Sequence, residues 1–287
     1  MRKIYVIANP KRKPDVVPLL EELLPWMRKC ADVVKVDKGG ESDLSHIQAD
    51  LVLVFGGDGS ILSAARRLHG NPVPVFGVNV GHLGFMAEIS AEELQKTLPQ
   101  ILRGEYVLSR RMMLLVCVVA PSRRRHNGHP EPHEYVALND AVIQRFPRAR
   151  MISVDVRVSG EEVSVYKGDG LIVSTATGST AYNLSAGGPI LSERLKALIV
   201  TPISPHTLAS RPIVLSGEET VEVRVATRTG EPVELVVDGQ VSCPLPSGAV
   251  VEIGRAPYEF NLVTVGRKGR YEIIRDKLHW AGWVKER

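Results

Sequence analysis

The stretch at residues 55–60 reads FGGDGS, and its one reactive side chain is the carboxylate of Asp58. It follows an apolar run at 51–55 and precedes a segment, 61–68, whose apolar residues recur at helical spacing. Glycines let the backbone approach a ligand closely, and the free N–H groups at a helix start attract phosphate. We therefore predict a turn that binds the phosphates of a phosphoryl donor, formed by Gly56, Gly57, Gly59 and Ser60, with Ser60 as helix N-cap.

The chemistry of this turn depends on why it carries an acid. A carboxylate beside phosphate groups repels them unless it binds a divalent cation or takes a proton from an attacking hydroxyl. Both roles belong to phosphoryl transfer. The alternative is an aspartate that only caps the helix. The turn matches neither the GxGxxG of dinucleotide-binding dehydrogenases nor the GK[ST] ending of a P-loop.

A second polar segment, residues 167–191, reads KGDGLIVSTATGSTAYNLSAGGPIL. It repeats the order of acid, glycine, apolar strand and a turn rich in Gly, Ser and Thr. The hydroxyl and amide groups suit hydrogen bonds to a ligand, and Tyr182 offers an apolar surface to a base. The alternative is that the hydroxyls serve as caps and turn contacts inside the protein. We predict a ligand-binding segment.

The first third of the chain alternates apolar strands with amphipathic helices, which predicts a parallel sheet covered on both faces. Ser90 is the expected N-cap of the last of these helices. The strands are expected at 3–8, 31–36, 49–55 and 73–79, and the helices at 15–29, 61–68 and 90–106.

From about residue 111 the pattern changes to β-strands with polar alternation, as at 153–160, 219–227, 232–240 and 249–256, with a tight hairpin at 237–241. The tail, 270–283, is helical again. We therefore predict an α/β plus β fold. A Rossmann-like parallel α/β domain, 1–110, is followed by a β-rich, sandwich-like domain, 111–265, and residues 266–287 return to the first domain.

Composition narrows the class of protein. The 287 residues are 44% hydrophobic and 24% charged, which is typical of a globular protein. The net charge of +4 allows phosphate-bearing ligands but does not favour nucleic acid, and we interpret the basic run at 122–129 as a solvated loop. The three cysteines lack disulfide or metal-site spacing, and the longest apolar run, 112–120, is too short to span a membrane. We expect a cytoplasmic protein.

Several segments together resemble the NAD kinase family, in the order and spacing typical of it: 56–60, 76–89, 137–145, 167–191, 201–215 and 237–240. The resemblance spans nearly the whole chain, including the LHW of the tail. It implies transfer of the γ-phosphate of ATP to the adenosine 2′-hydroxyl of NAD, giving NADP, with Mg²⁺ or another divalent cation. It further implies a homodimer or homotetramer that binds NAD and ATP, and no nucleic acid or membrane.

The resemblance also implies residue roles. Asp58 is similar to the family's general base, with Gly59 beside the substrate. The family commonly has Asn-Glu where this chain has Asn139 and Asp140, so the carboxylate here is shorter. Thr177 and the run from Thr180 to Ser185 are similar to the family's binding site for the adenine and nicotinamide riboside, which can be shared between subunits. No metal ligand is assigned. The positions that match NAD contacts are Asp58, Gly59, Asn139, Asp140, Arg150, Lys167, Asp169, Thr177, Thr180, Ala181, Tyr182, Asn183, Leu184, Ser185 and Gln240.

Two other functions remain as alternatives. A lipid kinase of the diacylglycerol or sphingosine type shares the GGDG turn, but it does not account for the segment at 178–189. An NAD-binding sensor without catalysis would not need an intact Asp58. The sequence does not distinguish ATP from polyphosphate as the donor.

Overall fold

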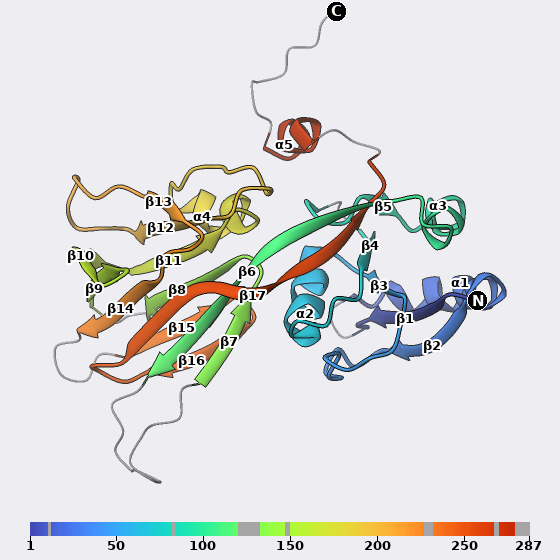
Figure 1. Ribbon diagram of the computed structural model, residues 1–287, viewed down its shortest axis with the longest axis horizontal. Coiled ribbons are helices and arrows are strands. Elements are labelled where there is room, and N and C mark those ends of the chain that lie inside the picture. Colours follow the sequence, from blue (N-terminus) through green and yellow to red (C-terminus); the bar gives the residue numbers. More distant parts are fainter. Residues whose placement is uncertain are drawn as a thin grey trace, which may run out of the picture. The chain divides into compact units, whose positions relative to one another are not determined.

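The computed structural model describes residues 1–10, 13–81, 84–119, 133–146, 150–226, 232–266 and 270–278. These residues form two compact units (Figure 1). Unit 1 consists of the described residues of 1–110 and 261–287, and unit 2 consists of those of 111–260. Two long strands, β6 (Val107–Val119) and β17 (Val250–Thr264), contribute residues to both units.

Unit 1 contains the predicted parallel sheet, in the order β4–β3–β1–β2. A short strand, β5, pairs in parallel with β4, and Leu262 near the end of β17 pairs with Val75 of β4. The central strands are buried along their whole length, which explains their continuous apolar sequences. The strands are β1 (Lys3–Ala8), β2 (Asp32–Asp37), β3 (Leu51–Phe55), β4 (Val75–Asn79) and β5 (Ile89–Ser90).

Helices cover both faces of this sheet, as predicted. The apolar sides of α1 (Val16–Cys30) and α3 (Leu94–Leu102) join one buried cluster with alternate residues of β1 and β3, such as Val6 and Leu53. The third helix, α2 (Asp58–Leu68), packs on β3 and β4 through Ile61. A Cβ atom at Gly77 of β4 would lie 2.6 Å from the end of the Ile61 side chain, so a larger residue there would require Ile61 to move.

Two predicted helix caps are wrong. Helix α2 begins at Asp58 with Gly57 as the N-cap, because Gly57 is extended and the N–H of Ser60 already donates to the Gly57 carbonyl at 2.9 Å. Helix α3 begins after Glu93, whose carboxylate accepts the N–H of Ser90 at 3.0 Å, while Ser90 itself ends β5. In both cases the backbone conformation, and not the capping tendency of a serine, sets the first helical residue.

Unit 2 consists of two antiparallel sheets. The first has the order β13–β12–β11–β8–β15–β16, and the second contains β10–β9–β14–β17, with β6 beside β17 and β7 beside β6. Asp238 and Gly239 have φ of 49° and 63° in the predicted hairpin between β15 and β16. The strands not yet given are β7 (His133–Ala137), β8 (Asp140–Arg145), β9 (Ile152–Val158), β10 (Glu161–Gly168), β11 (Gly170–Thr175), β12 (Ala197–Ile203), β13 (Ile213–Ser216), β14 (Val221–Ala226), β15 (Val233–Val237) and β16 (Val241–Leu245).

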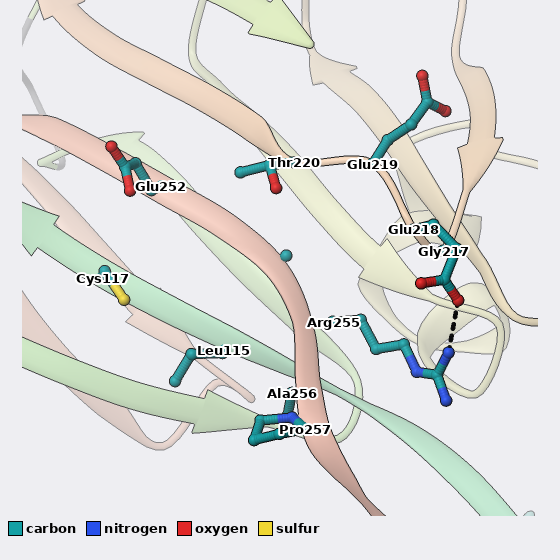
Figure 2. Close-up of a pocket in the computed structure, with 11 residues that line it drawn as sticks. Leu115, Cys117, Gly217, Glu218, Glu219, Thr220, Glu252, Arg255, Ala256 and Pro257 are labelled. Carbon is teal, nitrogen blue, oxygen red and sulfur yellow. Dashed lines mark hydrogen bonds and ion pairs between the residues drawn. The ribbon is translucent and has the colours of Figure 1, made fainter. Parts of the chain in front are cut away.

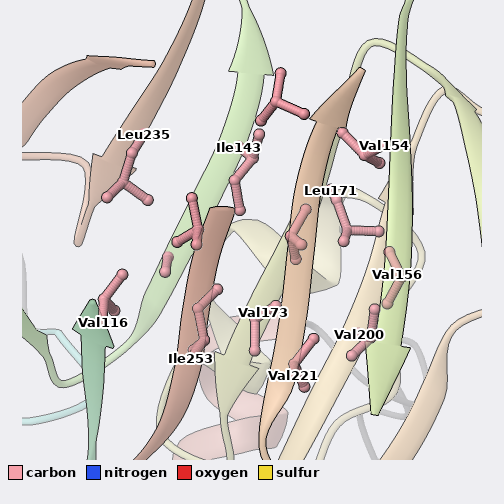
Figure 3. Close-up of a cluster of buried hydrophobic side chains, with 14 of the residues drawn as sticks. Val116, Ile143, Val154, Val156, Leu171, Val173, Val200, Val221, Leu235 and Ile253 are labelled. Carbon is pink, nitrogen blue, oxygen red and sulfur yellow. The ribbon is translucent and has the colours of Figure 1, made fainter. Parts of the chain in front are cut away.

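The core of unit 2 lies between these two sheets. Leu171 and Val173 of β11 point toward the side chains of Val156 on β9 and Val221 on β14 (Figure 3). Each such buried aliphatic side chain contributes about 1.5–3 kcal/mol to stability. The alternation predicted from the sequence therefore forms a β-sandwich.

The C-terminal tail and the basic run were also predicted from the sequence, as a helix and a loop. Helix α5 (Arg270–Leu278) belongs with unit 1 and buries Ile274, which confirms the helical prediction for those residues. Residues 279–283 and the predicted loop at 122–129 lie outside the described residues. Within the part of the chain that the structure describes, no helix is long and apolar enough to cross a membrane.

Candidate active site

The glycine-rich turn lies at the carboxyl edge of the unit 1 sheet. Strand β3 ends at Phe55, and the N–H of Gly56 donates to the Val78 carbonyl of β4 at 2.9 Å. A side chain at Gly57 would meet no atom within 4 Å, so the backbone there faces open space. Open α/β sheets bind ligands at this edge, and the predicted donor turn of Gly56, Gly57, Gly59 and Ser60 lies there.

The carboxylate of Asp58 is held by backbone N–H groups from a separate segment. Its Oδ2 atom accepts the N–H of Phe85 at 2.7 Å, and its Oδ1 atom accepts the N–H of Met86 at 3.0 Å. Hydrogen bonds to an ionised oxygen are strong and directional, so the orientation of the half-buried Asp58 side chain is fixed. Sequence reasoning missed this contact, although it had singled out the segment 76–89.

Unit 2 contains a cavity of about 370 Å³ that gathers several predicted NAD contacts. Its volume suits a nucleoside-sized group. Four of the predicted residues lie in the lining, namely Asn139, Asp140, Ala181 and Tyr182. The rest of the lining consists of Val142, Gln144, Val236, Asp238 and Gly239.

Two aspartates at this cavity have different environments. The carboxylate of Asp238 accepts the backbone N–H groups of Leu138, Asn139 and Asp140 at 3.2, 2.8 and 3.3 Å. Asp140 is 4% exposed, and burial, followed by the negative charge of Asp238, raises its pKa to about 7. Near neutral pH, Asp140 is therefore partly protonated, and its O–H can donate a hydrogen bond. Sequence reasoning used Asp238 only as a turn residue.

Several hydroxyls of the polar segment are used inside the protein. Thr175 Oγ1 donates to the Leu138 carbonyl at 2.7 Å and accepts the N–H of Gly178 at 3.1 Å. Ser179 Oγ donates to the Ala176 carbonyl at 2.7 Å. These two hydroxyls therefore form turn contacts inside the protein, which was the alternative to ligand binding.

Asn183 has the same internal role in this structure. It is fully buried, and its amide donates to the carbonyls of Ser179 and Pro189, both at 3.1 Å. Its Oδ1 atom accepts the hydroxyl of Thr201 at 2.7 Å. The side chain therefore fixes the turn next to Tyr182, which is 42% exposed. The remaining predicted residues of the segment are half-buried Thr177, Thr180 and Leu184 and exposed Ser185.

The other predicted contacts lie outside the lining of the cavity: Arg150, Lys167, Asp169 and Gln240. Asp169 forms an ion pair with Arg145, whose Nε lies 2.6 Å from its Oδ1. Sequence reasoning did not single out Arg145. Arg150 and Lys167 are exposed, and Gln240 is half-buried in the β15–β16 turn.

A second cavity of unit 2, of about 440 Å³, contains none of the predicted residues. Figure 2 shows Glu218, Glu219 and Glu252 around it, with Arg255 bonded to Glu218 at 2.6 Å. Burial, together with the charges of nearby Glu134 and Glu252, raises the pKa of the Cys117 thiol, so this cysteine stays protonated. Three carboxylates would repel a phosphate, so this cavity does not suit the phosphoryl donor.

A parallel α/β unit with one oriented carboxylate in a glycine-rich turn, joined to a β-sandwich whose cavity has an apolar lining with a few polar groups, is the arrangement of a nucleotide-binding phosphotransferase. Comparison with known proteins makes this specific. Residues 41–106 match the ATP-NAD kinase N-terminal domain, and residues 138–265 match the ATP-NAD kinase C-terminal domain.

Relatives and solved structures agree. The chain is 40% identical over 292 residues to the NAD kinase of Syntrophotalea carbinolica, covering 98% of this chain and 99% of that protein. It is 38% identical over 280 residues to the NAD kinase of Rhodopirellula baltica, covering 98% and 87%. The chain therefore belongs to the NAD kinase family.

Two solved structures share its fold. Yeast NADH kinase complexed with NADH has a TM-score of 0.83 at 20% identity, over 98% of this chain and 88% of that one. An NAD kinase from Archaeoglobus fulgidus in complex with ATP has a TM-score of 0.71 at 25% identity, over 97% and 98%.

Proposed function

We propose that this chain transfers the γ-phosphoryl group of ATP to the 2′-hydroxyl of the adenosine ribose of NAD, with Asp58 as general base. The observation that carries the proposal is the orientation of Asp58. Its carboxylate is fixed by two backbone N–H groups at the edge of the sheet where nucleotides bind. Family membership supports NAD as acceptor, and the ATP complex of the Archaeoglobus fulgidus relative supports ATP as donor.

The reaction needs a base because a ribose hydroxyl is a weak nucleophile. As the 2′-oxygen bonds to the γ-phosphorus, its proton passes to Asp58, the bond from the γ-phosphorus to the bridging oxygen breaks, and ADP leaves. A positioned base contributes about 10²–10⁴-fold to the rate. Alignment and charge neutralisation by backbone donors, such as the N–H groups at the start of α2, supply much of the rest.

We assign the binding of NAD to unit 2 and that of the donor phosphates to unit 1. Asn139 supplies an amide to the 370 Å³ cavity, Asp140 supplies an acidic O–H in its protonated form, and Tyr182 supplies an aromatic face. Asn183 supports this surface from within. The further NAD contacts that we propose outside the cavity are Arg150, Lys167, Asp169, Thr177, Thr180, Leu184, Ser185 and Gln240.

The described residues constrain how a divalent cation takes part. They contain no group of three or more His, Cys, Asp and Glu side chains that could hold a metal ion. Mg²⁺ readily keeps several waters and is often held by one or two carboxylates together with the phosphates of a nucleotide. The N–H groups at the start of α2 would hold the donor phosphates, and Mg²⁺ bound to those phosphates would neutralise their charge.

Assembly and location are also proposals. The three thiols, of Cys30, Cys117 and Cys243, are free, which agrees with a reducing compartment, the cytoplasm. A homodimer or homotetramer would allow one subunit to complete the segment 180–185 of another. Light scattering on the purified protein, with and without NAD, tests this assembly directly.

The test of function is direct. Purified protein is incubated with NAD, Mg²⁺ and either ATP or polyphosphate, and the product is quantified with an NADP-specific dehydrogenase. We expect NADP with ATP, formed at a rate about 10²–10⁴-fold lower by the Asp58→Ala variant. Binding of NAD without NADP from either donor would indicate a sensor, and phosphorylation of diacylglycerol or sphingosine in its place would indicate a lipid kinase.

A further inference from the structure

The segment Gly84–Met86 contacts the Asp58 carboxylate through backbone groups. Membership of the NAD kinase family gives this segment no role of its own. Both carboxylate oxygens are engaged, one by the N–H of Phe85 and the other by the N–H of Met86. The segment is anchored on its far side, because Met86 and Ala87 are buried and Ile89 pairs with Val78 of β4. The two donors are therefore fixed to the same sheet that carries the Asp58 turn.

Gly84 makes this contact sterically feasible. A Cβ atom at Gly84 would overlap Oδ1 and Cγ of Asp58 and would lie 2.6 Å from its Oδ2. The carboxylate thus lies directly over the α-carbon of Gly84. The φ of Gly84 lies outside the range from +20° to +160°, so the case for a glycine here rests on the contact with Asp58. Contact with Asp58 is the reason that a glycine is needed here.

We propose that Gly84, with the N–H groups of Phe85 and Met86, is the positioning element of the catalytic base. Each carboxylate oxygen has two acceptor directions. The two N–H groups occupy one on each oxygen and leave the others available to the substrate hydroxyl. Any side chain at position 84 displaces the carboxylate while leaving the NAD-binding residues of unit 2 unchanged. This inference rests on the proposed role of Asp58 as base.

The kinetic test uses Gly84→Ala. A displacement of about 1 Å costs on the order of 10²-fold in rate, so we expect kcat to fall by about 10²-fold. The dissociation constant of NAD, measured by calorimetry, should stay at the wild-type value. Gly39→Ala is the matched control, because its Cβ would lie 3.8 Å from the nearest atom, an ordinary contact in the same unit. Wild-type kcat in Gly84→Ala would overturn the proposal.

A double-mutant cycle separates this proposal from the base assignment. Gly84→Ala is introduced into the wild type and into Asp58→Ala, and the urea midpoint of unfolding is measured for all four proteins. We expect Gly84→Ala to lower the midpoint in the wild type and to leave it unchanged in Asp58→Ala, where the carboxylate is missing. An equal decrease in both backgrounds would overturn the contact. High activity of Asp58→Ala would instead overturn the base assignment while leaving the stability result valid.

Discussion

Asp58 in unit 1 differs from Asp140 and Asp238 in unit 2 in burial and in the number of backbone N–H groups that donate hydrogen bonds to its carboxylate. Asp58 is half-buried and accepts two N–H groups, which orient it while leaving it accessible. Asp238 is 6% exposed and accepts three. Asp140 is equally buried, yet no group of the described chain donates a hydrogen bond to its carboxyl, and its pKa is raised to about 7.

The difference shows that burial and the number of backbone donors decide what an aspartate does. Two donors orient the Asp58 carboxylate at an accessible edge, which is what the proposed role of general base requires. Three donors hold the Asp238 carboxylate near Asp140, and burial, followed by the charge of Asp238, raises the pKa of Asp140 to about 7. One residue type thus supplies the proposed base in unit 1, and a structural anion and a partly protonated acid in unit 2.

The largest expected effect is the loss of stability on replacing Asp238. Asp238→Ala removes the acceptor of three backbone N–H groups, and each buried donor left unsatisfied costs about 1–3 kcal/mol. We expect a loss of several kcal/mol in the free energy of unfolding, on the order of 3 or more, measured by urea denaturation. Asp155→Ala, on the solvent side of β9, is the control and should change little. Equal stability of both variants would show that Asp238 does not organise the turn.

The next largest effect is the pH dependence of stability that the ionisation of Asp140 causes. Because its pKa is about 7 in the folded protein and 3.8 ordinarily, the folded protein keeps a proton between about pH 4 and pH 7 that the unfolded chain releases. The protonated Asp140 carboxyl therefore makes its full contribution to the free energy of unfolding below about pH 4. This contribution is lost as the pH rises through 7.

We expect Asp140→Asn to remove this dependence and to be more stable than the wild type at pH 8, by at most about 4 kcal/mol. Urea denaturation of both proteins at pH 5 and pH 8 measures the difference. An unchanged difference between the two proteins at the two pH values would show that Asp140 ionises normally.

The smallest effect is expected from the hydrogen bond between Thr201 and Asn183, which holds the turn next to Tyr182. Thr201→Val removes the hydroxyl that donates to Asn183 Oδ1 and should cost about 1 kcal/mol of stability. Because Asn183 holds the turn that presents Tyr182, we also expect weaker NAD binding with kcat unchanged. Calorimetry with NAD measures this, and Thr207→Val in an exposed loop is the control. Unchanged NAD affinity would limit Asn183 to a role in folding.

The sequence predicts the elements well and the contacts between them poorly. Apolar periodicity is a local property, so strands such as 51–55 and the sandwich alternation at 153–158 are evident from residue types. The caps at Ser60 and Ser90 were wrong because Gly57 and Glu93 have the backbone position that starts each helix.

The donors to the carboxylates could not be predicted, for a physical reason. Phe85, Met86 and Leu138 act through backbone N–H groups, which every residue except proline has, so residue type gives no signal. A similar limit applies to Asn183 in the polar segment. Periodicity does not tell whether its amide faces a ligand or closes a turn, and here it closes a turn.

The most direct test of Asp58 as base is a single-turnover measurement with Asp58→Ala. Alanine is preferable to asparagine, because an Asn amide would place its own N–H group against one of the two backbone donors. Rapid-quench formation of NADP at saturating ATP, Mg²⁺ and NAD gives the rate of the chemical step, and calorimetry gives the dissociation constant of NAD. We predict a decrease of about 10²–10⁴-fold in the rate with unchanged NAD affinity. A wild-type rate, or a parallel loss of rate and NAD affinity, would contradict the account.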